Sequence, residues 1–394
     1  MNTGYIKLSH FSVKEYLLSS HVEEYFSINE KTSHSKISEL LIAYLLQFDD
    51  DSLSRKAIIG SMPLAQYAAE HWIDHAKSGE KDPTLLQLIL NLFISGSTPL
   101  INWIQIYNID MEYHGFDHFP LDRSKVCCAL YYSSLAGIQE VSDCLLHKGE
   151  NANAEGGRLG NPLQAASYTG NEAIVKLLLE SGAGVNAKGG EFENALQAAS
   201  HEGHELIMKL LLGDGAWVNA DGGLYGNALQ AASLGGNEVI VKLLLENGAR
   251  VNAEGGQYGN ALQAASFGGN EAIVKLLIKN GAVVHAEGGQ YGNALQAAAA
   301  SHQGKVEIIK LLLENRAEVN AEGGQYGNAL QAASCRDNEA IVKPLLENRA
   351  ELNAEGGLYG NALQAASFGG NEAIVKLLLE NGAEVNVEGG MHSK

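Results

Sequence analysis

Residues 260–292 read NALQAASFGGNEAIVKLLIKNGAVVHAEGGQYG, and this stretch decides the fold. Its opening string, N-[AP]-L-Q-A-A, recurs almost unchanged at Asn161, Asn194, Asn227, Asn260, Asn293, Asn328 and Asn361. Successive copies lie 33 residues apart, except for one step of 35 that an extra alanine pair near Ala299-Ala300 explains. Self-similarity at such a period indicates a repeat architecture. With a worn copy that starts near Cys128, eight copies are predicted over residues 126–390, followed by a tail at 391–394.

Each unit is predicted to contain two short helices. Asn260 can cap the first helix, over Ala261–Phe267, since its side-chain oxygen can accept from the first free amides. Asn270 is expected to cap the second helix, and Glu271 suits the positive end of that helix dipole. Apolar residues then follow at helical spacing, and Gly281 stands where a left-handed cap would end the helix.

The rest of the unit, residues 283–292, is predicted to form a turn or hairpin finger because it contains Gly288-Gly289. Two short helices and a finger cannot bury their apolar face alone, so neighbouring units must stack to make a core. The sequence therefore predicts an all-α fold, in which a small, mostly helical domain precedes an elongated and curved solenoid.

This unit resembles the ankyrin repeat. The T-P-L-H segment of that family corresponds to Asn260–Gln263, its A-A-x-x-G segment to residues 264–268, and its V-x-x-L-L-x-x-G-A segment to residues 274–282. The resemblance implies a module that binds other proteins. Gly255, Tyr258 and Gln263 stand where the family usually has Asp, Gly and His, so we expect the hydrogen bonds of the finger to differ from the usual ones.

Residues 1–125 show no repeat and are predicted to form the small helical domain. Ser12 and Glu15 make a capping box ahead of Tyr16, and Pro83 and Pro99 suit the first turns of helices. Apolar stripes and these start signals predict helices over residues 37–48, 64–72, 84–94 and 100–106.

The string LSHFSVKEYLL at residues 8–18 resembles the F-x-H-x-S-x-x-E-Y-L segment that follows the nucleotide-binding domain of NACHT-type signal-transduction ATPases. The later strings PLAQYAAEHWIDHA and NWIQIY, like the repeat itself, are similar to fungal NACHT–ankyrin proteins implicated in non-self recognition. The resemblance implies a NACHT module upstream of Met1, or a separate NACHT-containing chain as partner. No G-x-x-x-x-G-K-[ST] string occurs, so ATP hydrolysis is not carried over to this chain.

The composition argues against several classes of partner. The formal net charge of −19 repels a phosphate backbone, so nucleic acid is not an expected partner. No apolar run approaches the length of a membrane span, and no polybasic patch suits a membrane surface. The four cysteines, Cys127, Cys128, Cys144 and Cys335, lack zinc spacing and are interpreted as reduced thiols of a cytoplasmic protein.

Histidine pairs are the main candidates for metal ligands. His71 and His75 lie four residues apart on one predicted helix face, and His114 and His118 have the same spacing. A metal site needs further ligands, and none accompanies either pair, so ordinary packing is favoured. No metal, cofactor or catalytic set is predicted, and the chain is expected not to be an enzyme.

Two columns of the repeat are candidate partner-binding positions. The finger carries an aromatic or apolar ladder of Leu159, Phe192, Tyr225, Tyr258, Tyr291, Tyr326 and Tyr359. These residues either pack repeat on repeat, which is favoured, or contact a partner. A column at the end of the first helix varies although most others are nearly copied: Tyr168, His201, Leu234, Phe267, His302, Cys335 and Phe368. We expect this column, with Trp217 and Arg250 at the finger base, to select the partner.

A parallel column in the fingers is mostly acidic: Glu155, Lys188, Asp221, Glu254, Glu287, Glu322, Glu355 and Glu388. Its ordinary interpretation is a solvated edge, and its functional one is attraction to a basic partner.

Three positions break the repeat. Pro344 replaces a leucine of the second helix, which costs ~3 kcal/mol in a helix interior. Arg316 and Arg349 replace the capping glycine, where a left-handed backbone penalises a side chain. We expect local fraying around residues 335–350.

The sequence as a whole favours a non-enzymatic scaffold that binds a protein, as the sensor end of a fungal receptor of the NACHT type. The alternative is a truncated subunit or fragment of such a signal-transduction NTPase.

Overall fold

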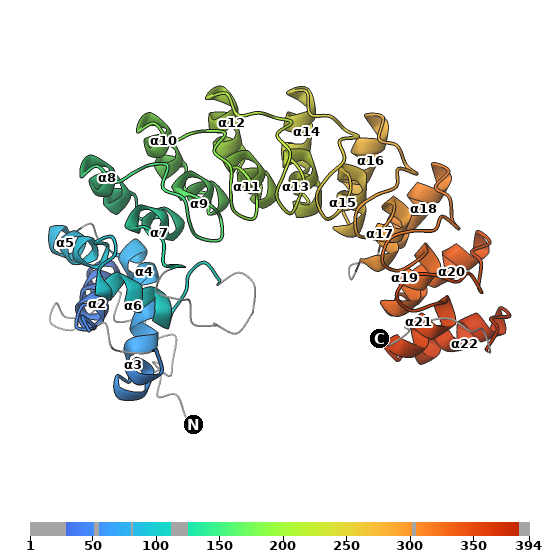
Figure 1. Ribbon diagram of the computed structural model, residues 1–394, viewed down its shortest axis with the longest axis horizontal. Helices are drawn as coiled ribbons and strands as arrows, with labels where there is room; N and C mark the ends of the chain where they lie inside the picture. The colour runs from blue at the N-terminus through green and yellow to red at the C-terminus, as the bar shows by residue number, and fades with distance from the viewer. Residues whose placement is uncertain (1–28, 51–54, 80–81, 112–124, 302–304, 386–394) are drawn as a thin grey trace, which may run out of the picture. The chain divides into compact units, whose positions relative to one another are not determined.

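A computed structural model describes residues 29–50, 55–79, 82–111, 125–301 and 305–385 of the chain (Figure 1). These residues form helices and turns, with isolated antiparallel bridges within the fingers, so the all-α prediction is confirmed. The chain divides into two compact units, Met1–Gly157 and Arg158–Lys394. The first predicted repeat copy lies in the N-terminal unit and the other seven in the C-terminal unit.

The N-terminal unit packs its helices around aromatic side chains. Trp103 is its centre: its ring lies 5.3 Å from Trp72 and 5.5 Å from Phe93, and its indole nitrogen donates to the carbonyl of Ala69 at 3.0 Å. The helices are α2 (Glu30–Leu45), α3 (Arg55–Ser61), α4 (Ala65–Ser78), α5 (Pro83–Leu92), α6 (Thr98–Ile106), α7 (Ala129–Ala136) and α8 (Gln139–His147).

The four helices predicted in the described part of this unit are present as α2, α4, α5 and α6. Asp82 caps α5 and Ser97 caps α6, each ahead of a proline in the first turn. Helix α3 was not predicted, since it is only seven residues long and has a single buried apolar residue, Ile58. The capping box at Ser12 and Glu15 lies outside the described residues.

The C-terminal unit is a curved stack of seven helix pairs (Figure 1). The first helices of the pairs line the inner side of the curve: α9 (Pro162–Tyr168), α11 (Ala195–Glu202), α13 (Ala228–Gly235), α15 (Ala261–Phe267), α17 (Ala294–Ala300), α19 (Ala329–Cys335) and α21 (Ala362–Gly369). The second helices lie outside: α10 (Glu172–Glu180), α12 (Glu205–Gly213), α14 (Glu238–Glu246), α16 (Glu271–Lys279), α18 (Val306–Glu314), α20 (Glu339–Glu347) and α22 (Glu372–Glu380).

The first helix of each pair forms for the predicted reasons. The side chain of Asn260 accepts from the amide of Gln263 at 2.9 Å, and α15 has the predicted bounds. Ala264 and Ala265 are fully buried, so neighbouring inner helices can approach closely. Gly281 has a φ of +87°, which confirms the predicted left-handed end of the second helix.

The predicted role of Asn270 is wrong. Its side chain makes no cap bond to α16; its amide nitrogen instead donates to the carbonyls of Ser233 at 3.0 Å and Leu234 at 3.3 Å in the preceding repeat. Carbonyls at the end of an inner helix have no partner within their own helix, so a donor from the next repeat satisfies them.

The three repeat-breaking residues are accommodated within regular helix pairs. Helix α20 spans Glu339–Glu347 with Pro344 inside it, so the proline does not end the helix. Arg316 and Arg349 take φ values of +67° and +64°, which confirms that the backbone stays left-handed without glycine. The expected fraying around residues 335–350 remains a prediction.

The 35-residue step has a different origin from the one predicted. Helix α17 has the same seven-residue length as α15, so Ala299 and Ala300 take the helical positions of Ser266 and Phe267. The two extra residues therefore follow α17, in the connection that leads to α18.

Candidate functional site

The finger residues of the ladder column stack on one another from repeat to repeat. Ring centroids lie 4.9 Å apart for Phe192 and Tyr225, and 6.0–6.4 Å apart along Tyr225, Tyr258, Tyr291, Tyr326 and Tyr359. The planes of successive rings differ by 11–26°, so the arrangement is a continuous stack.

Most of this ladder is buried. Tyr225, Tyr291 and Tyr326 expose 4–8% of their surface, whereas Tyr258 and Tyr359 are half-buried. Packing of repeat on repeat therefore accounts for the ladder, and only ring edges are left for contact with another molecule.

The variable column lies against this ladder. His201 packs between Phe192 and Tyr225, at 5.3 and 4.8 Å, and Phe267 packs between Tyr258 and Tyr291, at 5.4 and 4.5 Å. Tyr168 and Phe368 each contact one ladder ring, at 5.4 and 4.8 Å. The ladder from Leu159 to Tyr359 and the variable column from Tyr168 to Phe368 together are called the aromatic strip.

The variable column is most exposed at its last member. Tyr168 is buried, while His201, Leu234, Phe267 and Cys335 are half-buried. Phe368 exposes 65% of its surface. An aromatic side chain left this open to water is available to a partner.

Two predicted members do not belong to the described strip. His302 lies outside the described residues, and the helix register gives its column position at the end of α17 to Ala300. Trp217 lies four residues beyond the end of α12, exposes 62% of its surface and makes no ring contact with the strip in the described part of the chain.

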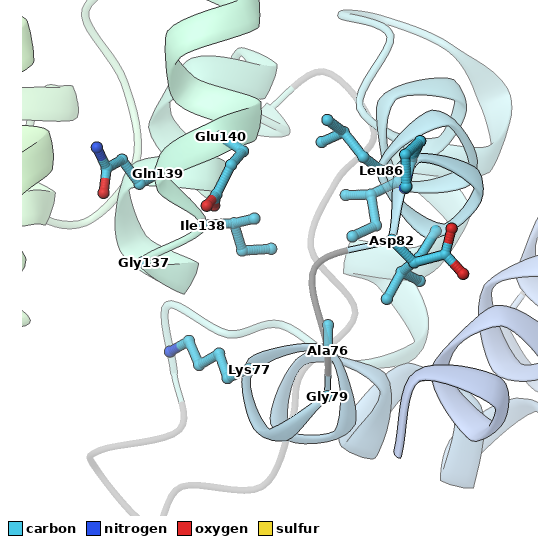
Figure 2. A pocket seen from close by; sticks show the side chains of 12 residues that line it. Ala76, Lys77, Gly79, Asp82, Leu86, Gly137, Ile138, Gln139 and Glu140 are labelled. Carbon is cyan, nitrogen blue, oxygen red and sulfur yellow. The ribbon is translucent and has the colours of Figure 1, made fainter. Parts of the chain in front are cut away.

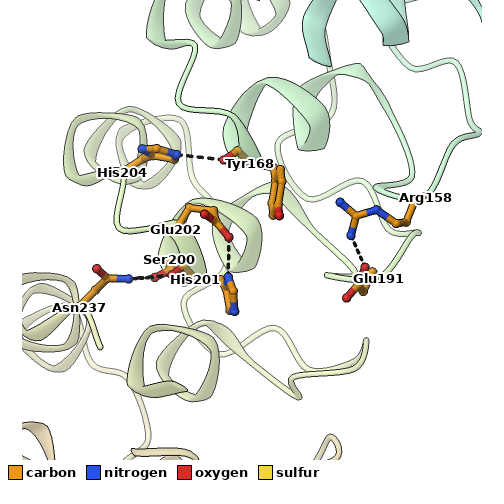
Figure 3. Close-up of polar contacts among 8 residues, drawn as sticks. All are labelled: Arg158, Tyr168, Glu191, Ser200, His201, Glu202, His204 and Asn237. Atoms are coloured by element: carbon orange, nitrogen blue, oxygen red, sulfur yellow. Dashed lines mark hydrogen bonds and ion pairs between the residues drawn. The ribbon is translucent and has the colours of Figure 1, made fainter. Parts of the chain in front are cut away.

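Charged side chains lie at two points of the strip. At its N-terminal end the guanidinium of Arg158 lies 5.2 Å from the ring centroid of Tyr168 and pairs with Glu191 (Figure 3). Farther along, Arg336 lies 5.6 Å from the centroid of Tyr326 and donates to its hydroxyl at 2.6 Å. Both contacts combine a cation–π interaction with a conventional polar partner.

A glutamine column that the sequence reasoning undervalued holds the fingers together. The side-chain nitrogen of Gln263 lies 3.3, 3.1 and 2.8 Å from the carbonyl oxygens of Ala286, Gly288 and Gly292 in the next finger. Equivalent bonds are made by Gln230, Gln296 and Gln331. Glutamine thus supplies donors where the usual repeat has histidine, and its recurrence in seven of the eight copies is the signal in the sequence.

Backbone bonds also join successive fingers at their tips. The amides of Glu191, Leu224, Gln257, Gln290, Gln325 and Leu358 each donate to a carbonyl of the preceding finger, at 2.7–3.0 Å. At the far end of five repeats, a side chain reaches back to the residues that end the preceding inner helix, as His204 does to the carbonyl of Tyr168 and Asn237 to that of Ser200 (Figure 3).

The environment of the ladder keeps its phenols neutral. Burial, with the neighbouring phenol of Tyr258, raises the pKa of Tyr291 to about 12. Burial also raises the pKa of Tyr225 and of Tyr258 above the ordinary value. Removing a phenol from water disfavours its charged form.

The N-terminal unit contains a separate concavity of about 560 Å³ (Figure 2). Leu86 and Asp82 of the α5 region lie on one side of it, and Ile138 and Glu140 of the α8 region lie on the other (Figure 2). Its walls are mostly apolar, with Lys77 among the charged groups at the edge, and they do not assemble a nucleophile with a base.

His71 and His75 pack against other aromatic side chains. His75 hydrogen-bonds His34 through their Nδ1 atoms at 2.7 Å, and His71 packs on the ring of Tyr67. No group of three potential metal ligands occurs in the described part of the chain. His114 and His118 lie outside it. None of the described helices is long and apolar enough to cross a membrane.

The stacked helix pairs and their bonded fingers define a repeat solenoid of the kind that serves as a protein-interaction scaffold. A model of ankyrin repeats matches the chain in three copies, over residues 163–255, 254–323 and 298–389. These matches cover more than half of the sequence, so the chain belongs to the ankyrin repeat family.

Two known proteins resemble parts of the chain. Azaphilone pigments biosynthesis cluster protein L of Monascus ruber is 34% identical over 181 residues, which are 42% of this chain and 38% of that protein. The human ASB11 ankyrin repeat domain is 26% identical, with a TM-score of 0.48, over 56% of this chain and 98% of that one.

Proposed function

We propose that the aromatic strip is the face with which this scaffold binds a protein partner, and that its variable column selects the partner. One observation carries the proposal. One column that differs among nearly copied repeats lies on one strip, against ladder rings that are aromatic from Phe192 onward. Variation in this column changes what the strip presents to a partner and leaves the stacked rings in place.

The exposure of the column supports a binding role. Phe368 is largely exposed, and Phe267 lies between two ladder rings with part of its surface open. Partly exposed aromatic anchors held rigidly by neighbours carry much of the energy in protein interfaces, because they lose little side-chain entropy on binding.

The test uses the full chain. A partner is first identified by affinity capture, and its dissociation constant is then measured with purified partner for the double variant Phe267→Ala/Phe368→Ala. We expect a loss of at least tenfold. The control is Leu206→Ala/Val239→Ala, because both residues expose 56% of their surface on outer helices. The proposal would be contradicted if the strip variant keeps its helical circular dichroism spectrum and binds the partner as tightly as the native chain does.

We propose further that the scaffold is the recognition end of a larger cytoplasmic receptor of the NACHT type. The support is the resemblance of residues 8–18 and of the repeat to NACHT–ankyrin proteins. An in-frame P-loop upstream of Met1 in the genomic sequence, or co-purification with a NACHT-containing chain from the cytoplasm, would agree with it. Absence of both would exclude this role and leave strip-mediated binding intact.

A further inference from the structure

The chain's own arginines show what the strip accepts. The guanidiniums of Arg158 and Arg336 lie over the rings of Tyr168 and Tyr326, and each also has a polar partner at the strip. A planar guanidinium can stack on an aromatic face in a way that a lysine ammonium cannot.

Other rings of the same strip have no such cation in the described residues. Phe267 lies between Tyr258 and Tyr291, and Phe368 lies beside Tyr359, without an arginine or lysine over any of these rings. Phe368 has one ring neighbour and is mostly exposed, so its open face can accept a cation from another molecule, whereas Phe267 presents only a ring edge.

Uncompensated negative charge accompanies these open positions. Glu254, Glu287, Glu322 and Glu355 are exposed on the fingers that carry the ladder tyrosines, and none of them forms an ion pair within the described residues. Glutamates of the outer helices differ, because Glu238, Glu271 and Glu372 each pair with a lysine four residues later. The unpaired finger glutamates therefore attract a basic partner to this edge.

The spacing of the ladder constrains the shape of that partner. Successive tyrosine centroids from Tyr258 to Tyr359 lie 6.0, 6.3 and 6.2 Å apart. Side chains on one face of an extended chain repeat every ~6.6–6.8 Å. An extended segment that lies along the strip can therefore place every second side chain near successive repeats, because its spacing is only slightly longer than that of the ladder rings. Residues four apart on a helix rise by about 6 Å, but each step also turns them by about 40° around the helix axis. A helical partner could therefore contact only a few successive repeats with one face.

We propose that the strip, from Tyr258 to Phe368, binds an extended, arginine-rich segment of a partner protein, with arginines at alternate positions. The inference rests on the proposed function and specifies its partner. One arginine stacks at Phe368 as Arg336 stacks at Tyr326, and the charge of the others meets the finger glutamates near Phe267 and along the strip.

Fluorescence anisotropy with the full chain tests the spacing and the chemistry. The probe is a labelled peptide with five Arg-Ser pairs. Control peptides carry five Lys-Ser pairs, or five arginines at every third position. We expect the alternating arginine peptide to bind at least tenfold more tightly than either control. Equal binding of the lysine peptide would mean that only charge is recognised, and equal binding of the third-position peptide would refute the extended register.

Two charge-matched variants locate the site. Glu254→Gln/Glu287→Gln should weaken binding of the alternating peptide by at least fivefold, whereas Glu238→Gln/Glu271→Gln on the outer helices should change it less than twofold. Phe267→Ala/Phe368→Ala should abolish the preference for arginine over lysine.

The proposal would be overturned if both glutamate variants lose affinity for the alternating peptide to the same extent. If a natural partner binds through the strip and the peptides do not, the arginine inference fails while the proposed function stands.

Discussion

At the scale of single residues, the array departs from its own pattern where a side chain occupies a position built for glycine. Gly281 and its counterparts end the second helices with a left-handed backbone, but Arg316 and Arg349 adopt the same conformation with a Cβ atom. A left-handed conformation costs roughly 1–2 kcal/mol for a residue other than glycine. The two arginines therefore strain consecutive repeats of the same unit.

Restoring glycine should stabilise the array. We expect Arg316→Gly and Arg349→Gly each to raise the free energy of unfolding by ~0.5–1 kcal/mol, because the relief of strain exceeds the added entropy of the unfolded chain. Urea unfolding followed by circular dichroism measures this. Arg250→Gly removes the same charge where φ is not positive, and it should not stabilise. If both substitutions change the free energy of unfolding equally, the loss of a positive charge explains the effect and backbone strain does not.

At the scale of the element, α20 tests how far stacking can tolerate a poor helix. Its sequence EAIVKPLLE differs from EAIVKLLLE of α10 and α22 only at Pro344. The proline provides no amide for the carbonyl four residues earlier, yet Ile341, Val342 and Leu345 are fully buried, as their counterparts in α10 are. Burial against neighbouring pairs keeps the helix in place.

We expect Pro344 to make α20 open locally more often than its sibling helices. Amides of residues 339–350 should exchange with solvent at least tenfold faster than those of residues 172–183, since an interior proline costs ~3 kcal/mol in helix stability. Pro344→Leu should remove the difference, as measured by hydrogen exchange with mass spectrometry. Exchange in α20 as slow as in α10 before the substitution would refute the predicted fraying.

The elements themselves could be predicted, and the bonds between repeats could not. Asn260, the alanines after it and Gly281 act within one unit, so their pattern fixed the bounds of α15. Asn270 and Gln263 bond to the preceding and following repeats, and no pattern within one unit reveals those carbonyls. The sequence also shows that the column varies, but the two residues inserted after α17 shift the register, so Ala300 and not His302 occupies the column position.

At the scale of the whole molecule, the tyrosine ladder makes the stability of the array sensitive to alkali. Burial raises the pKa of Tyr291 to about 12 and raises the pKa of Tyr225 and Tyr258, from an ordinary value near 10. The unfolded chain ionises near pH 10 while the folded chain holds its protons. The stabilisation is therefore complete below about pH 10 and is lost as the pH rises toward 12.

We expect the tyrosinate absorbance to rise together with the loss of helical signal between about pH 10 and pH 12. Tyr291→Phe removes one ionising group and should shift the unfolding midpoint to higher pH. Tyr67→Phe in the N-terminal unit, where the ring is exposed and stands outside the ladder, should leave the midpoint unchanged. Tyrosinate that appears near pH 10 with the helices intact would show that the ladder does not protect its phenols.

The bonds between fingers give the array one more property. Gln230 reaches forward to Gly255 and Gly259, and Gln263 reaches forward to Gly288 and Gly292 in the same geometry. Asn237 and Asn270 reach back in the same geometry as each other. The fingers therefore have interchangeable edges: excision of residues 260–292 would leave Gln230 on its own finger and bring Gln325 to Gln257, in place of Gln290. Recombination between copies can lengthen or shorten the recognition surface by whole units while the bonds between fingers are kept.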